Sequence, residues 1–200
     1  YSPDGRFMFG IGRTSAEKMV DGFLKYRLLR QTSDSHVPVS ITLFAGAYRT
    51  GLSNQIQSNG FDLYEHGTDR FSYCYQVMFG RKFNRNFSMQ IAPWMVHYNI
   101  VSSITDRNDA YGVAGIARMK FTQRAAFTVE YGYRINKYTN DTYYNSLGIG
   151  FEIETGGHVF QVHLTNSFGL VENQFYTHTA TKWNDAGIRL GFNVSRVFTL

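Results

Sequence analysis

Cysteine, proline and long apolar runs are scarce in this chain of 200 residues. Cys74 is the only cysteine and there are three prolines. A lone cysteine forms no internal disulfide, and its place between Tyr73 and Tyr75 favours a packed thiol over a nucleophile. No run of about 18 apolar residues occurs, which excludes a transmembrane helix.

Charge is also sparse, since charged residues make up 18% of the chain and the net charge is +5. Lys and Arg are scattered rather than gathered in a basic tract, so we expect no nucleic-acid partner. No HxxE, CxxC or GxSxG pattern and no glycine-rich phosphate loop occurs. His158 and His163 have odd spacing, which puts them on opposite faces of a strand. We therefore predict a protein that is not an enzyme and has no cofactor or metal site.

What the chain has in abundance is alternation of apolar and polar residues. In the segment 143–168, Leu147, Ile149 and Phe151 alternate with polar or small residues up to a Gly156-Gly157 turn. A period of two indicates strands whose two faces meet different surroundings. Ten segments show this pattern: 6–13, 19–30, 37–49, 70–81, 87–100, 110–121, 125–134, the two halves of 143–168, and 186–194.

The lengths of these strands and of their connections favour a membrane. Most strands run nine to thirteen residues, and crossing a bilayer at a tilt takes roughly 9–11. Connections alternate between short and long, as in outer-membrane barrels with short periplasmic turns and longer extracellular loops. The pattern predicts an all-β, up-and-down antiparallel transmembrane β-barrel in the bacterial outer membrane. Both termini would be periplasmic, and the long loops 50–69 and 169–184 extracellular.

Two local predictions concern Pro93 in the strand 87–100 and the aromatic rings near strand ends. The apolar phase shifts there from Phe87 and Ile91 to Trp94 and Tyr98, and Pro93 stands at the shift. Because proline cannot donate to the ladder, we expect a β-bulge at Pro93. Near strand ends, aromatic rings often lie at the headgroup level. The rings expected there are Trp94, Tyr98, Tyr131, Tyr133 and Tyr143.

With apolar faces toward lipid, the polar faces would line the interior. Both signs of charge occur on neighbouring strands there, which allows cross-strand ion pairs. One interpretation is a salt-bridge network that fills a narrow barrel, and the other is a small polar pore tuned by the charges. The predicted interior charge network comprises Asp21, Lys25, Arg27, Arg118, Lys120, Glu130, Arg134, Glu152, Glu154, His163 and Arg189.

Three stretches carry a family resemblance: 21–31 (DGFLKYRLLRQ), the hairpin 143–167 and the ending 191–200 (GFNVSRVFTL). Together they resemble a Bacteroidetes-type family of outer-membrane β-barrel proteins of unknown function. The resemblance spans essentially all of 1–200 as one domain. It implies further strands upstream of Tyr1, and twelve in all. It transfers no activity and no catalytic residues.

The leading hypothesis is a non-enzymatic outer-membrane barrel that is a structural or accessory subunit of a larger membrane complex. Its partners would be outer-membrane lipid and lipopolysaccharide, together with other membrane or periplasmic subunits that bind the long loops. One alternative is a small-solute channel with a charged polar lumen. The other is a soluble ligand-binding β-barrel, which would keep its apolar faces inside.

Overall fold

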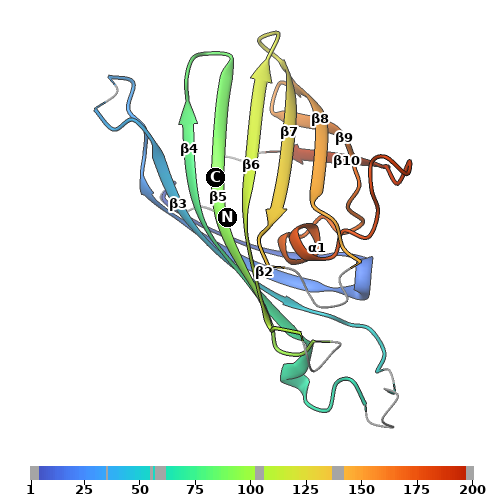
Figure 1. Ribbon diagram of the computed structural model, residues 1–200. Coiled ribbons are helices and arrows are strands. Elements are labelled where there is room, and N and C mark those ends of the chain that lie inside the picture. Colours follow the sequence, from blue (N-terminus) through green and yellow to red (C-terminus); the bar gives the residue numbers. More distant parts are fainter. Residues whose placement is uncertain are drawn as a thin grey trace.

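The predicted strands form one antiparallel sheet in the computed structural model, which describes residues 5–34, 36–54, 56, 62–101, 106–136 and 142–196. Ten strands follow one another in sequence order, each paired with the next (Figure 1). The all-β, up-and-down prediction is confirmed. The strands are β1 (Phe7–Arg13), β2 (Val20–Leu29), β3 (Ser40–Arg49), β4 (Phe71–Lys82), β5 (Phe87–Tyr98), β6 (Asp109–Lys120), β7 (Ala125–Arg134), β8 (Ser146–Thr155), β9 (His158–Thr165) and β10 (Arg189–Arg196).

The two faces of the sheet differ as the alternation requires. On the outer face, large apolar side chains stand exposed along every strand, among them Leu24, Tyr75, Ile91 and Phe151. The inner face holds the buried residues, such as Phe44, Cys74 and Val96. A soluble ligand-binding barrel would have the reverse arrangement, so that alternative is wrong.

The sheet has two free edges. Among the described residues, β1 pairs only with β2 and β10 only with β9. The ten strands therefore form a curved sheet that is not closed into a ring. The twelve-strand expectation stays a prediction.

The connections gather at two ends of the sheet, and the three longest lie at the same end. One end, here the short-turn end, carries residues 30–39, 83–86, 121–124 and 156–157. Gly156 and Gly157 both have positive φ, as a two-residue hairpin turn requires. The long-connection end carries the described parts of the connections 14–19, 50–70, 99–108, 135–145 and 166–188, with short 3-10 turns η1 (Ala16–Lys18) and η2 (Gly67–Arg70).

The predicted bulge at Pro93 is wrong. The pairing of β5 with β6 keeps one register through Pro93↔Val113, and β5 pairs with β4 in the same register on both sides of the proline. Trp94 and Tyr98 point inward by plain alternation, so they do not lie at a membrane interface. Among the described strands, a register shift occurs in β2, between Arg27 and Leu29.

The segment 169–184 also differs from its predicted role as an external loop. It contains the helix α1 (Glu172–Thr177), which lies on the concave side of the sheet and contacts β7 and β4 (Figure 1). Five of the six helical residues are buried. None of the helices among the described residues has the length and hydropathy needed to cross a bilayer.

Candidate functional site

The helix α1 is held inside the sheet by aromatic packing. The Tyr176 ring stacks on Trp94 of β5, with centroids 4.8 Å apart and planes 8° from parallel. Phe175 and Tyr176 join a buried cluster with Phe44, Tyr48 and other inward residues of β3–β6. The Trp94 Nε1–H has no acceptor among the described residues, so packing rather than hydrogen bonding holds this ring.

Glycine at position 112 makes the stack possible. Gly112 on β6 lies directly opposite Trp94. A Cβ at this position would come within 2.2 Å of both Trp94 Cζ2 and the Tyr133 carbonyl oxygen. The indole therefore lies flat against the backbone of β6, which leaves room for Tyr176 on its other face.

Polar contacts from three strands fix the helix in position. The Tyr48 hydroxyl donates to Glu172 Oε2 at 2.7 Å, and Asn173 Nδ2 donates to Ser72 Oγ at 2.9 Å. Arg134 Nη1 donates to the Thr177 carbonyl at 3.1 Å. Because these groups are largely buried, each lost bond would leave an unsatisfied polar atom. The contacts specify one position for α1 rather than a loose fit.

His178, directly after α1, is enclosed by aromatic rings. Its ring meets Tyr98 and Tyr143 edge to face, at centroid distances of 5.2 and 4.9 Å. The Tyr98 hydroxyl lies 3.2 Å from His178 Nδ1 and 2.6 Å from Thr177 Oγ1. Burial, together with the nearby Arg134 charge, lowers the pKa of His178 to about 4. The imidazole is therefore neutral at pH 7.

The chain on either side of α1 is anchored at the start of β10. Asn166 Nδ2 donates to the carbonyls of Asn145 and Thr181, at 3.0 and 2.9 Å. Arg189 Nη1 donates to Thr181 Oγ1 at 2.8 Å and to the Asn166 carbonyl at 3.1 Å. The connection 166–188 thus enters the interior and returns to the sheet at fixed points.

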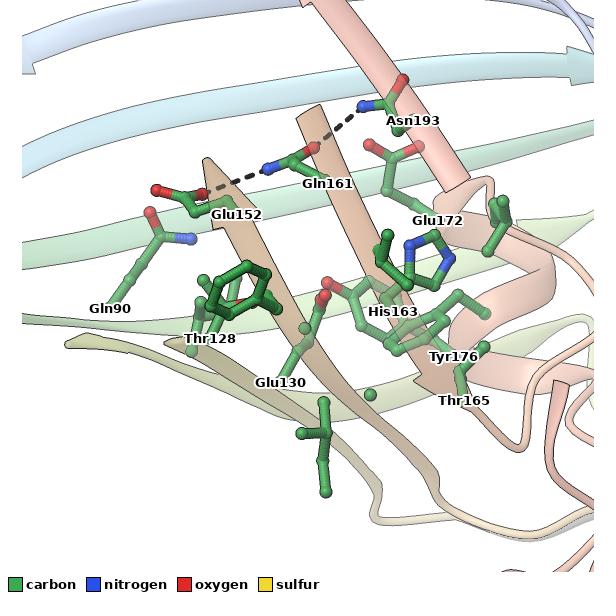
Figure 2. Close-up of a pocket in the computed structure, with 18 of the residues that line it drawn as sticks. Gln90, Thr128, Glu130, Glu152, Gln161, His163, Thr165, Glu172, Tyr176 and Asn193 are labelled. Atoms are coloured by element: carbon green, nitrogen blue, oxygen red, sulfur yellow. Dashed lines mark hydrogen bonds between the residues drawn. The ribbon is translucent and has the colours of Figure 1, made fainter. Parts of the chain in front are cut away.

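Beneath α1, toward the short-turn end, lies a cavity of about 670 Å³. Apolar side chains such as Phe44, Met78 and Phe175 line one part of it, and polar side chains line the rest. Figure 2 shows the polar part, where Asn193 Nδ2 donates to Gln161 Oε1 and Gln161 Nε2 donates to Glu152 Oε2. These bonds link β10, β9 and β8.

Three carboxylates border this cavity in different states. Glu152 forms an ion pair with Arg118, and Glu172 accepts from Tyr48. Glu130 has no hydrogen bond or ion pair among the described residues, and its charge and that of Glu172 repel each other. Lys25 also lines the cavity. The arrangement is a chamber of mixed apolar and polar lining, in which carboxylates outnumber cations, with one end covered by α1.

The predicted interior charges occupy three levels of the sheet. Lys25, Glu130, Glu152 and His163 line the cavity, and Arg118 pairs with Glu152. Arg134 and Arg189 lie at the long-connection end, where they hold residues 166–188 as described. Asp21 is half-buried and lies near Glu172. Arg27 and Lys120 are also half-buried, whereas Glu154 is exposed at the short-turn end.

Sequence reasoning missed the residues that hold α1: Phe44, Tyr48, Ser72, Trp94 and Tyr98. Phe44, Tyr48 and Ser72 lie on the face that alternation marks as polar. Trp94 and Tyr98 lie on the same inner face, after the apparent phase shift in β5. Large aromatic residues on an otherwise polar face were the available signal. They indicate that this face packs against something other than water.

The described residues offer little for catalysis. No group of three His, Cys, Asp or Glu side chains among them could hold a metal ion. Cys74 is fully buried in β4, as predicted for a packed thiol. His97, on the outer face, contacts Asp109 at 2.6 Å. The site is thus a filled interior with a chamber beneath it.

Comparison with known proteins agrees with the architecture. No curated protein matches the chain. The sequence model of a family described as a membrane-bound β-barrel domain of unknown function matches residues 1–198, and the chain belongs to that family.

Proposed function

We propose that this membrane-bound barrel is a non-enzymatic protein of the outer membrane that acts as a structural or accessory subunit. The observation that carries the proposal is the position of α1, which fills the interior at the long-connection end. Trp94, Tyr48 and Arg134 hold it from three strands. An interior occupied by the chain itself favours contact through the outer surfaces over passage through the middle.

The described part of the connection 50–70 supports a partner contact at that end. Arg70 Nη1 donates to the Leu52 carbonyl at 2.6 Å, and its guanidinium lies over the Tyr64 ring. The Asn54 side chain exchanges two hydrogen bonds, both 2.9 Å, with the Tyr64 backbone. A preformed surface binds at a lower entropic cost than one that must order on binding.

Isolation from native membranes in mild detergent tests the role. We expect a stoichiometric partner protein with the wild-type chain. The double variant Glu65→Ala, His66→Ala alters two exposed residues of the connection 50–70 and should weaken capture. Asp185→Ala, exposed on the other long connection, is the matched control. A chain that is isolated alone under all conditions would contradict the subunit role.

A small-solute channel is the second candidate, and the cavity of about 670 Å³ is what favours it. Its polar lining of Glu130, Gln161 and Asn193 would suit hydrated solutes. In this case α1 would have to leave its position for solutes to pass. The two candidates therefore differ in whether the wild-type chain conducts.

A further inference from the structure

The outer face of the sheet carries an apolar groove of about 600 Å³ across β2–β5. Two outward rows of side chains border it. The pairing of neighbouring strands places Leu24, Ala45, Tyr75 and Met95 in one row. The same registers place Tyr26, Leu43, Val77 and Pro93 in the next row, nearer the short-turn end. The groove is therefore part of the surface that meets lipid.

Ala45 and Pro93 lie in the middle of the groove lining. Ala45 lies between Leu24 and Tyr75, so its methyl group leaves a recess beside larger neighbours. At Pro93 the ladder between β4 and β5 has no paired residues between the pairs Gln76↔Trp94 and Phe79↔Ile91. A proline offers no N–H to the neighbouring strand. The recess at Ala45 and the unpaired stretch at Pro93 both lie within the lining of the groove.

Cationic side chains lie beyond the groove at the short-turn end. On β4, Val77, Phe79 and Arg81 share the outer face by alternation, and Arg81 is exposed. From Val77 to Arg81 the strand rises about 13 Å. Arg30, Lys82 and Arg85 are also exposed at this end. An apolar channel that leads to a cluster of positive charge matches the layout of an anionic lipid.

We propose that this groove binds an acyl chain of an anionic phospholipid from the leaflet at the short-turn end, with its phosphate near Arg81. The chain lies over Ala45 and Pro93 between the rims made by Tyr26 and Tyr75. The groove is continuous with the lipid-facing surface of a membrane-bound barrel. The proposal does not depend on a subunit role or on conductance.

Native mass spectrometry of the full chain in detergent, titrated with dioleoylphosphatidylglycerol, tests the groove. We expect one retained lipid on the wild type. Ala45→Phe fills the recess and should weaken retention at least tenfold. Ala47→Phe adds the same ring on the same outward face of β3, outside the groove, and should leave retention unchanged. Val77→Phe serves as a second filling variant if Ala45→Phe fails to fold.

The charged end is tested separately with a matched lipid. Arg81→Ala should weaken dioleoylphosphatidylglycerol binding about fivefold, since one cation near an anionic headgroup is worth about that much. It should leave binding of dioleoylglycerol, which lacks the phosphate, unchanged. Arg49→Ala, exposed on the outer face at the other end, is the control. Equal retention of dioleoylphosphatidylglycerol by Ala45→Phe and Ala47→Phe would overturn the proposal. Displacement of the bound lipid by lipopolysaccharide alone would also overturn it.

Discussion

The position of α1 should depend on pH because of His178. Its pKa is about 4 when the helix is in place, against 6.5 for an exposed histidine. Between about pH 6.5 and pH 4, His178 is protonated when α1 is displaced but stays neutral when α1 is in place. Acid therefore favours displacement, and the stabilisation is fully present only above pH 6.5.

The two pKa values set the magnitude. The free energy that holds α1 in place should fall by about 1.4 kcal/mol at pH 5.5 and by about 3 kcal/mol at pH 4, relative to pH 7.5. Glu17 works in the opposite direction, because burial raises its pKa, with a smaller opposing effect of its hydrogen bond to Gln174. A variant without the imidazole is therefore needed to isolate the histidine.

Trp94 emission is a direct probe, since its ring stacks on Tyr176. The chain has two tryptophans, so Trp183→Phe leaves Trp94 as the sole emitter. Urea titrations of this background in detergent at pH 7.5, 5.5 and 4 would give the free energies. The same series with His178→Gln should lose the acid destabilisation. Identical pH dependence with and without His178 would refute the reasoning.

Three substitutions test the packing and the charge pair by the same titration. Tyr176→Ala removes a buried ring stacked on Trp94 and should lower the free energy that holds α1 in place by about 3–5 kcal/mol. A loss below about 1 kcal/mol would show that the stack does not hold the helix. Gly112→Ala places a methyl group within 2.2 Å of Trp94 Cζ2 and should destabilise by a few kcal/mol, whereas wild-type stability would contradict the close approach. Arg118→Ala leaves the Glu152 carboxylate without its cation. Because the arginine is one-third exposed, we expect a coupling energy of about 1–2 kcal/mol in a double-mutant cycle with Glu152→Gln. A coupling energy near zero would count against the pair.

The sheet was predictable because period-two alternation is a local signal. All ten strands lie where the pattern placed them, with ends that differ by a few residues, such as Ser40 in place of Val37 at the start of β3. Alternation also gave the face of most residues outside β5, as for Glu152 inside and Phe151 outside. The shortest turns and the longest connections gave the two ends, although 30–39 at the short-turn end is longer than 14–19 at the other end.

The contents of the interior were not predictable from the same signal. The six residues of α1 are too few to show a helical period, and their stability comes from tertiary packing rather than local propensity. Trp94 and Tyr98 were misplaced because aromatic residues on an inward face imitate a phase shift. Their partner, Tyr176, lies about 80 residues away in the sequence.

The central claim is that the chain closes its own interior with α1. Planar-bilayer conductance of the wild-type chain beside a variant that replaces Glu172–Thr177 with glycine and serine tests this most directly. The wild type should show no steady conductance, and the variant should open a pore through the vacated interior. Steady conductance through the wild type, equal to that of the variant, would contradict the claim.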